Sequence, residues 1–175
     1  MLILIFFLAT LGFGYFTWRY AVLNPRSQGP YRFVAFEGIT ALVLLNYRVW
    51  FADILSPRQI ASFAALLIAI YLPLAGMLTL KSRGKPEGHF EYTTELVTTG
   101  VYRFIRHPMY ASLLFLAIGA YLKQPLDPPG ALIFVITLAA VFMTAKAEEK
   151  DLVAAFGEPY IDYMKRTARF IPFVL

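Results

Sequence analysis

The sequence predicts an all-α integral membrane protein with about five transmembrane helices. Three observations carry this prediction. Hydrophobic residues make up 59% of the 175 residues and charged residues only 15%, a composition far from that of soluble globular domains. The charged residues lie between long apolar segments rather than among them. Residues 59–80 contain no charged side chain over 22 positions, and roughly 20 apolar residues suffice to cross a bilayer.

The apolar segments define the expected spans in order. They comprise residues 1–18, 33–47, 59–80, 108–122 and 128–145. The first has no basic residues at its start and no clear cleavage site, so we interpret it as a retained anchor rather than a signal peptide. Glu37 interrupts the second, which leaves open whether that segment fully crosses. The last two are short, so we expect Lys123 and Lys146 to extend toward the interface or the bilayer to thin locally.

The distribution of Lys and Arg predicts the orientation. Cytoplasmic loops of membrane proteins collect basic residues. With five spans and the N-terminus outside, every Lys and Arg falls inside except Arg48, Arg58 and Lys123. Omitting the second span removes most of this bias. We therefore predict five spans, with the N-terminus outside and the C-terminus inside.

This topology predicts a single domain, residues 1–175, with its polar chemistry on one face. Three N-terminal spans (1–80) precede a cytoplasmic loop (81–107), a helical hairpin (108–147) and a cytoplasmic tail (148–175). The loop and the tail share the cytoplasmic face and hold most of the ionisable residues. We expect any cofactor site at this cytoplasmic, C-terminal side.

The composition also argues against several classes of function. The formal charge is +5, but the basic residues do not form the single stripe that is typical of nucleic-acid binding, so we expect no nucleic-acid partner. The absence of cysteine excludes disulfides and thiolate chemistry. His89 and His107 are the only histidines, and with no cysteine we expect no metal site.

A first group of polar residues lies directly before the fourth apolar segment, within residues 96–110. Its central motif is Arg-His-Pro-x-Tyr, and Pro108 suits the first position of a helix. The free backbone N–H groups at such a helix start suit a carboxylate or phosphate. Arg103 and Arg106 are equally explained as cytoplasmic anchors. The imidazole of His107 is better suited to hydrogen bonding than to lipid.

A second group follows the fifth apolar segment. It begins with the adjacent acids Glu148 and Glu149, continues through Phe-Gly-Glu-Pro-Tyr at residues 156–160, and ends with Arg-Phe-Ile-Pro at residues 169–172. One interpretation is the solvated end of a membrane helix, with Gly157 as its C-cap. Carboxylates near a bilayer surface are disfavoured without partners, however. A cationic or hydroxyl-rich ligand is one such partner.

Together, these motifs resemble those of the isoprenylcysteine carboxyl methyltransferase family, which groups with the membrane phospholipid methyltransferases. The resemblance runs from Thr94 to the C-terminus, and residues 1–80 match only as hydrophobic spans. It implies S-adenosylmethionine as the cofactor. The cofactor-binding residues that it implies are Thr94, Glu95, Leu96, Val97, Gly100, Tyr102, His107, Pro108, Met109, Tyr110 and Glu148.

The chemistry of this cofactor agrees with these residue types. Its α-carboxylate suits backbone N–H groups and His107, its sulfonium suits aromatic faces and carboxylates, and its ribose hydroxyls suit Glu148. The sequence departs from the family at Thr144, where the family has an arginine for the substrate carboxylate. Because threonine cannot form a bidentate carboxylate pair, the acceptor stays open between an isoprenylcysteine-like carboxylate and a lipid amine.

Methyl transfer from a sulfonium is an in-line displacement, so the enzyme must align the reactants and exclude water. We expect Glu149, as the proton acceptor for an amine substrate, and Arg106 to be the catalytic residues. We expect a lipophilic substrate to enter from the bilayer and to contact Thr144 and Glu37.

Two other classes of protein remain open. A membrane sterol reductase binds NADPH, and Arg103, Arg106 and Lys85 offer a basic cluster for its extra phosphate. A non-catalytic scaffold or small transporter also accounts for the spans, although the chain lacks the two symmetric halves that are common in transporters. The compact chain suggests the plasma membrane of a prokaryote. The oligomeric state stays open.

Overall fold

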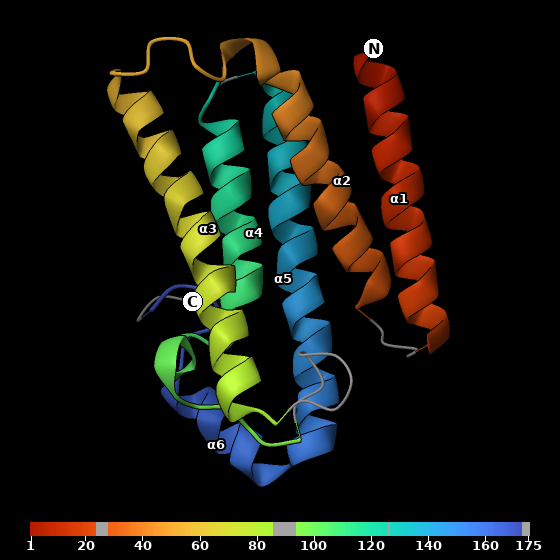
Figure 1. Ribbon diagram of the computed structural model, residues 1–175, viewed down its shortest axis with the longest axis vertical. Coiled ribbons are helices and arrows are strands. Elements are labelled where there is room, and N and C mark those ends of the chain that lie inside the picture. Colours follow the sequence, from red (N-terminus) through yellow and green to blue (C-terminus); the bar gives the residue numbers. More distant parts are fainter. Residues whose placement is uncertain (24–27, 86–93, 126, 173–175) are drawn as a thin grey trace.

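The computed structural model describes residues 1–23, 28–85, 94–125 and 127–172, and these residues are helical without any β-strand. Figure 1 shows the elements as an elongated bundle. They are α1 (Leu2–Leu23), α2 (Gly29–Leu45), the 3-10 turn η1 (Tyr47–Val49), α3 (Pro57–Arg83), the 3-10 turn η2 (Gly100–Arg103), α4 (Pro108–Tyr121), α5 (Pro128–Phe156) and α6 (Glu158–Arg166).

Four helices form the body of the bundle, with α4 at its centre. Helix α4 packs against α3, α5 and α2, and α2 also packs along α5. Helix α1 packs against α2 at the edge of the bundle, and most of its side chains are exposed (Figure 1). The elements η2 and α6 lie at the end opposite the N-terminus, beyond the start of α4 (Figure 1).

Proline and short polar residues determine where the long helices begin. The Ser56 hydroxyl accepts a hydrogen bond from the Gln59 backbone N–H at the start of α3, and Pro57 occupies the first helical turn. Asp127 caps α5 in the same way, accepting from the Gly130 N–H at 2.9 Å. Such side chains satisfy N–H groups that have no partner within the helix, and proline there sacrifices no hydrogen bond.

Three helices among the described residues are long and apolar enough to cross a membrane by length and composition: α1, α3 and α5. The chain is therefore an integral membrane protein of helical type. Helix α4 is apolar but has only 14 residues, and α2 has 17 residues. These two correspond to the expected spans 33–47 and 108–122, which the sequence marked as interrupted and as short, whereas the segment 128–145, also marked as short, lies in the 29-residue helix α5.

The fifth helix is longer than its apolar segment predicts. It continues to Phe156, so Glu148 and Glu149 lie about two turns before its end rather than at a membrane exit. The residues that follow the acids include Leu152, Ala154 and Ala155, which favour helix continuation. Both carboxylates therefore belong to the helical part of α5 that leads to α6.

Helices α2 and α5 approach each other closely at Gly38. A Cβ atom at this position would lie 2.0 Å from the Thr137 Oγ1 and 3.2 Å from its Cβ. The missing side chain therefore permits the close packing of α2 on α5. This contact fixes the N-terminal half of the chain against the helix that carries the two acids.

Candidate functional site

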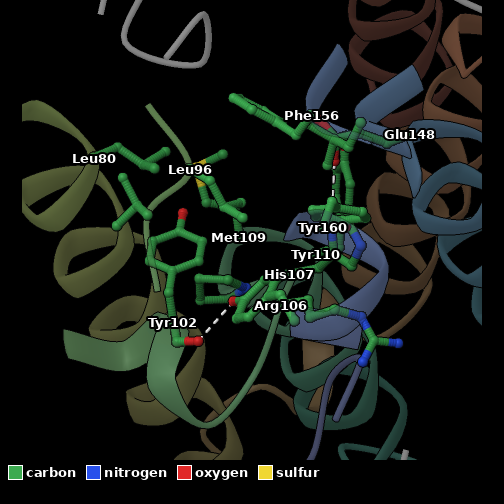
Figure 2. A pocket seen from close by; sticks show the side chains of 14 residues that line it. Leu80, Leu96, Tyr102, Arg106, His107, Met109, Tyr110, Glu148, Phe156 and Tyr160 are labelled. Carbon is green, nitrogen blue, oxygen red and sulfur yellow. Dashed lines mark hydrogen bonds and ion pairs between the residues drawn. The ribbon is translucent and has the colours of Figure 1, made fainter. Parts of the chain in front are cut away.

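A cleft lies at the end of the bundle where α3, α4, α5 and α6 converge. Its empty volume is about 610 Å³, including the open solvent at its mouth. Figure 2 shows Leu80, Leu96 and Tyr102 on one side and Glu148, Tyr160 and Tyr110 on the other. The lining residues are Leu80, Leu96, Val97, Tyr102, Arg106, His107, Pro108, Met109, Tyr110, Glu148, Leu152, Phe156, Tyr160 and Tyr163.

A short backbone pairing brings the two polar motifs together. Ile105 and Ala168 form a parallel β-bridge. The Arg106 N–H donates to the Ala168 carbonyl at 2.9 Å, and the His107 N–H donates to the Arg169 carbonyl at 3.1 Å. The Arg-His-Pro segment and the closing Arg-Phe-Ile-Pro segment are therefore held side by side, although about 60 residues separate them in the chain.

His107 is buried between the two adjacent acids. Its Nδ1 lies 3.3 Å from Glu148 Oε2, and its Nε2 lies 3.4 Å from Glu149 Oε1 without the alignment of a hydrogen bond. Burial acts to lower the pKa of His107, but its contacts with the two carboxylates outweigh burial and raise it. The arrangement therefore favours the imidazolium form.

Glu149 is the centre of a buried network of ion pairs. Arg106 Nε donates to its Oε1 at 3.1 Å, and Arg169 forms a bidentate pair with both oxygens at 3.0 and 2.7 Å. Arg106 also donates through Nη1 to the carbonyls of Met164 and Thr167. Both carboxylate oxygens of Glu149 are thus already engaged, which favours a positioning role for this residue over that of a free base.

The structure places most of the expected cofactor residues around the cleft. The residues expected from the sequence that line it are Leu96, Val97, Tyr102, Arg106, His107, Pro108, Met109, Tyr110 and Glu148. They come from four separate segments of the chain: residues 96–97, η2, residues 106–110 around the start of α4, and the last third of α5. Residue type and chain order alone did not show that these segments meet.

Other expected residues lie away from the lining. Thr94 donates to the Lys85 carbonyl at 3.0 Å, and Glu95 pairs with Lys85 on the surface. Gly100 begins η2 at a φ of +61°, which favours glycine, and packs against Thr79.

The two expected substrate contacts also have partners elsewhere in the bundle. The Thr144 hydroxyl is buried and donates to the Ala140 carbonyl within α5 at 2.8 Å. Glu37 accepts a hydrogen bond from Thr10 of α1 at 2.8 Å. Neither residue lines the cleft.

The structure adds residues that the sequence did not single out. Leu80, Leu152 and Phe156 supply apolar walls. The Tyr163 hydroxyl donates to the Tyr102 carbonyl at 2.6 Å and ties α6 to η2. Tyr160 is only 2% exposed, and its hydroxyl has no hydrogen-bond partner among the described residues. Tyr160 stands in the Phe-Gly-Glu-Pro-Tyr motif, which was the only available signal for it.

The N-terminal half also reaches the site. Gln28, which directly precedes α2, is buried, and its Oε1 accepts a hydrogen bond from the Tyr110 hydroxyl at 3.3 Å. This contact joins the start of α2 to the cleft. The sequence offered no motif for it, because residues 1–80 carry only a hydrophobic pattern.

The cleft combines a carboxylate, an imidazole, several phenols and aliphatic walls, and it therefore suits a ligand with both a flat apolar part and a polar, cationic part. Within the part of the chain that the structure describes, no three His, Asp or Glu side chains gather as metal ligands would. The fold defines an integral membrane protein of helical type with a cleft at one end of its helical bundle.

Comparison with known families narrows this class. The phospholipid methyltransferase family model matches residues 57–159, and the chain belongs to this family. The match includes the cleft-forming motifs up to the start of α6. It confirms the resemblance that the motifs indicated, and it makes the chain a member of a methyltransferase family.

Curated relatives carry two kinds of name. Protein-S-isoprenylcysteine O-methyltransferase of Mus musculus is 35% identical over 83 residues, which cover 47% of this chain and 29% of that protein. Its Saccharomyces cerevisiae counterpart is 39% identical over 80 residues, covering 45% and 33%. Methanethiol S-methyltransferase of Mycobacterium tuberculosis is 30% identical over 152 residues, covering 75% and 59%. The chain thus spans less than two thirds of each. No solved structure matches significantly.

Proposed function

We propose that this protein is an S-adenosylmethionine-dependent methyltransferase that acts on a lipophilic acceptor at the membrane boundary. One observation carries the proposal. The fold gathers the family motifs, including His107 and Glu148, around a single cleft that also has aliphatic and aromatic walls. The relatives are named for methyl transfer to isoprenylcysteine and methanethiol, which agrees with a methyl donor in this cleft.

The residues present fit this cofactor. The Glu148 carboxylate and the neighbouring tyrosine faces suit the sulfonium and ribose. The aliphatic side chains of Leu80, Leu96 and Val97 suit an adenine ring. The buried Tyr160 hydroxyl has no partner among the described residues, and a buried hydroxyl without a hydrogen bond is costly. A polar ligand in the cleft would satisfy it.

S-adenosylmethionine, when bound, supplies an electrophilic methyl group. The chain itself binds and orients the reactants and keeps water from the cleft. The ion pairs of Glu149 with Arg106 and Arg169 hold His107 and the start of α4 in place. An acceptor that carries a proton needs a base. Among the described residues, Glu148 is the carboxylate in the cleft lining, where it pairs with His107, whereas both oxygens of Glu149 are engaged by Arg106 and Arg169.

The proposed acceptor is lipophilic. Its binding does not involve an arginine at position 144 of α5, because that residue is a threonine. That threonine is buried and hydrogen-bonded within its own helix. A carboxylate acceptor would therefore need another cation. A thiol or an amine needs none, and the relative with the longest match reported above is named for a thiol acceptor.

We also propose the five-span topology for the helices α1 to α5, with the N-terminus outside and the cleft on the cytoplasmic side. Support comes from the helical bundle, in which η2 and α6 lie at the end opposite the N-terminus (Figure 1). Basic residues lie at this same end of the bundle, as is typical of cytoplasmic loops; they are Lys81, Arg83, Arg103 and Arg106. The chain then forms one membrane domain with a cytoplasmic site.

Calorimetric titration of the detergent-purified protein tests the cofactor. We expect binding of S-adenosylmethionine and of its demethylated product. Glu148→Gln should weaken that binding about thirtyfold or more, because removal of one partner of a buried, charged hydrogen bond costs about 2 kcal/mol or more. Glu95→Gln is the matched control, since Glu95 pairs only with Lys85 on the surface in the described structure, and it should bind like the wild type.

Two outcomes would overturn this assignment. Tight NADPH binding without S-adenosylmethionine binding would identify a reductase instead. Equal affinity of the wild type and Glu148→Gln for the methyl donor would show that the cofactor does not occupy this cleft.

A further inference from the structure

A second, strongly basic groove lies beside the cleft, between the segment after η2 and the C-terminal end of α6. Its lining residues are Arg103, Phe104, Arg106, Met164, Lys165, Arg166, Thr167, Ala168, Arg169 and Pro172. An adjoining cavity shares Arg103, Arg166 and Thr167 and adds Thr98 and Tyr163. Among the described residues, no carboxylate lines the groove. It is separated from the cleft by Arg106, which borders both.

The tertiary structure builds this groove from two distant segments. The bridge between Ile105 and Ala168, with the hydrogen bond from the Ala168 N–H to the Phe104 carbonyl at 3.2 Å, joins them. Arg103 ends η2, and Arg166 ends α6. Cations at the end of α6 alone are explained by the helix dipole. That explanation does not cover Arg103, which comes from another element and lines the same two cavities.

The charges in the groove are only partly balanced. Five cationic side chains line it within the part of the chain that the structure describes. Among the described residues, Glu149 pairs with Arg106 and Arg169, and Asp162 pairs with Lys165 at 2.8 Å. The remaining excess of positive charge lies toward Arg103 and Arg166, whose side chains are exposed. Such an excess attracts an anion.

We propose that this groove binds the phosphate group of an anionic phospholipid. Arginine guanidinium groups suit phosphate oxygens because they donate in a planar fork. Thr98 borders the adjoining cavity, as does Thr167, whose hydroxyl donates to the Tyr163 carbonyl at 2.7 Å. Phe104, which is 51% exposed, also lines the groove, and the Arg103 guanidinium lies 5.8 Å from its ring. An exposed aromatic ring next to cations on a membrane protein is typical of the lipid headgroup region.

The site does not depend on methyl transfer. It lies on the far side of Arg106 from the cleft and needs neither the methyl donor nor the acceptor. A bound headgroup would anchor η2 and α6, the two elements that carry Tyr102 and Tyr160 of the cleft. Binding can therefore be measured in the absence of S-adenosylmethionine.

Native mass spectrometry of the detergent-purified protein, with thermal unfolding in parallel, tests the site. The probes are short-chain phosphatidylglycerol, short-chain phosphatidylcholine and inorganic phosphate. The test variant is Arg103→Gln/Arg166→Gln, and the matched control is Lys81→Gln/Arg83→Gln, which removes two exposed cations from the last turn of α3 outside the groove. Circular dichroism verifies that both variants are folded.

We expect phosphatidylglycerol to bind the wild type and the control alike. The test variant should bind it at least about tenfold more weakly, since each basic residue lost near an anionic headgroup costs roughly fivefold in affinity. The affinity for phosphatidylglycerol should also fall as the salt concentration rises.

If both variants lose the same affinity for phosphatidylglycerol, the basic groove is not a specific site, and the lipid is attracted by the overall charge of this end of the protein. If phosphatidylcholine binds as tightly as phosphatidylglycerol, the proposal that the groove selects an anionic phospholipid is overturned. Saturation by inorganic phosphate without binding of phosphatidylglycerol would retain the phosphate site but overturn its lipid source.

Discussion

At the scale of single residues, Tyr160 is a buried side chain of the cleft to which the sequence assigned no role. Its hydroxyl is buried and without a partner among the described residues, whereas the Tyr163 hydroxyl on the same helix is hydrogen-bonded to the Tyr102 carbonyl. Burial and the nearby carboxylates raise the pKa of Tyr160, so the phenol stays protonated and can donate. We therefore expect Tyr160 to donate a hydrogen bond to the bound cofactor.

Replacement of Tyr160 by phenylalanine separates this role from a structural one. Tyr160→Phe should leave the thermal midpoint of the unliganded protein unchanged or raised, because it removes a buried group that lacks a partner. It should weaken S-adenosylmethionine binding by about tenfold, the cost of one hydrogen bond to a charged ligand group. Tyr163→Phe is the contrast, since it should lower the midpoint. Unchanged cofactor affinity in Tyr160→Phe would refute the donor role.

His107 predicts a pH dependence of stability. Its pKa is raised in the folded state by Glu148 and Glu149, relative to about 6.5 in the unfolded chain. A raised pKa means that the stabilisation is fully present below about pH 6.5 and is lost as the pH rises through the folded-state pKa. Thermal unfolding from about pH 6 to about pH 9 should therefore show a falling midpoint for the wild type. His107→Gln should lack this component, and parallel curves for the two proteins would contradict the assignment.

At the scale of helices, the contact between α2 and α5 depends on the absence of a side chain at Gly38. Gly38→Ala would place a Cβ atom 2.0 Å from Thr137 Oγ1, and overpacking of this kind costs about 1–3 kcal/mol. We expect a lower thermal midpoint. Gly12→Ala in α1 is the control, because no described atom outside its own stretch of helix lies within 4 Å of the added Cβ, and alanine favours a helix over glycine.

A double variant makes this test specific. Gly38→Ala/Thr137→Ala removes the Thr137 Oγ1 and Cγ2 atoms that the new methyl group meets, and it should recover a large part of the lost stability. If Gly38→Ala is as stable as the wild type, or if the double variant loses the sum of both changes, helices α2 and α5 are not packed as described.

The elements also show what a hydrophobic pattern can predict. The apolar segments predicted the positions of helices α1 to α5, because apolar side chains gather in helices that face lipid or the bundle interior. The ends were less well predicted. Helix α5 runs to Phe156 instead of ending near residue 145, since its polar last turns extend beyond the apolar part and retain helix-forming residues. Hydropathy therefore does not predict the end of a helix whose last turns are polar.

At the scale of the whole molecule, the part of the chain that matches the family model is also the part that forms most of the cleft. The family model covers residues 57–159, and this stretch includes most of the cleft lining together with the helices that support it. The remaining contributions come from the ends of the chain. Gln28 contacts Tyr110 from the start of α2, and Arg169 pairs with Glu149 from the segment after α6. The complete site therefore requires the folded chain from α2 to the closing motif.

The sequence by itself determined the helical membrane class and the family, and the family resemblance predicted Tyr102, His107 and Glu148 as members of one site. It could do so because apolar length and compact motifs are local properties of the chain. The tertiary structure decided which acid faces the cleft, that Glu149 is enclosed by Arg106 and Arg169, and that Tyr160 joins the lining. It also created the basic groove. These features depend on a backbone pairing between residues about 60 positions apart, and a pairing over that separation cannot be predicted from a local sequence pattern.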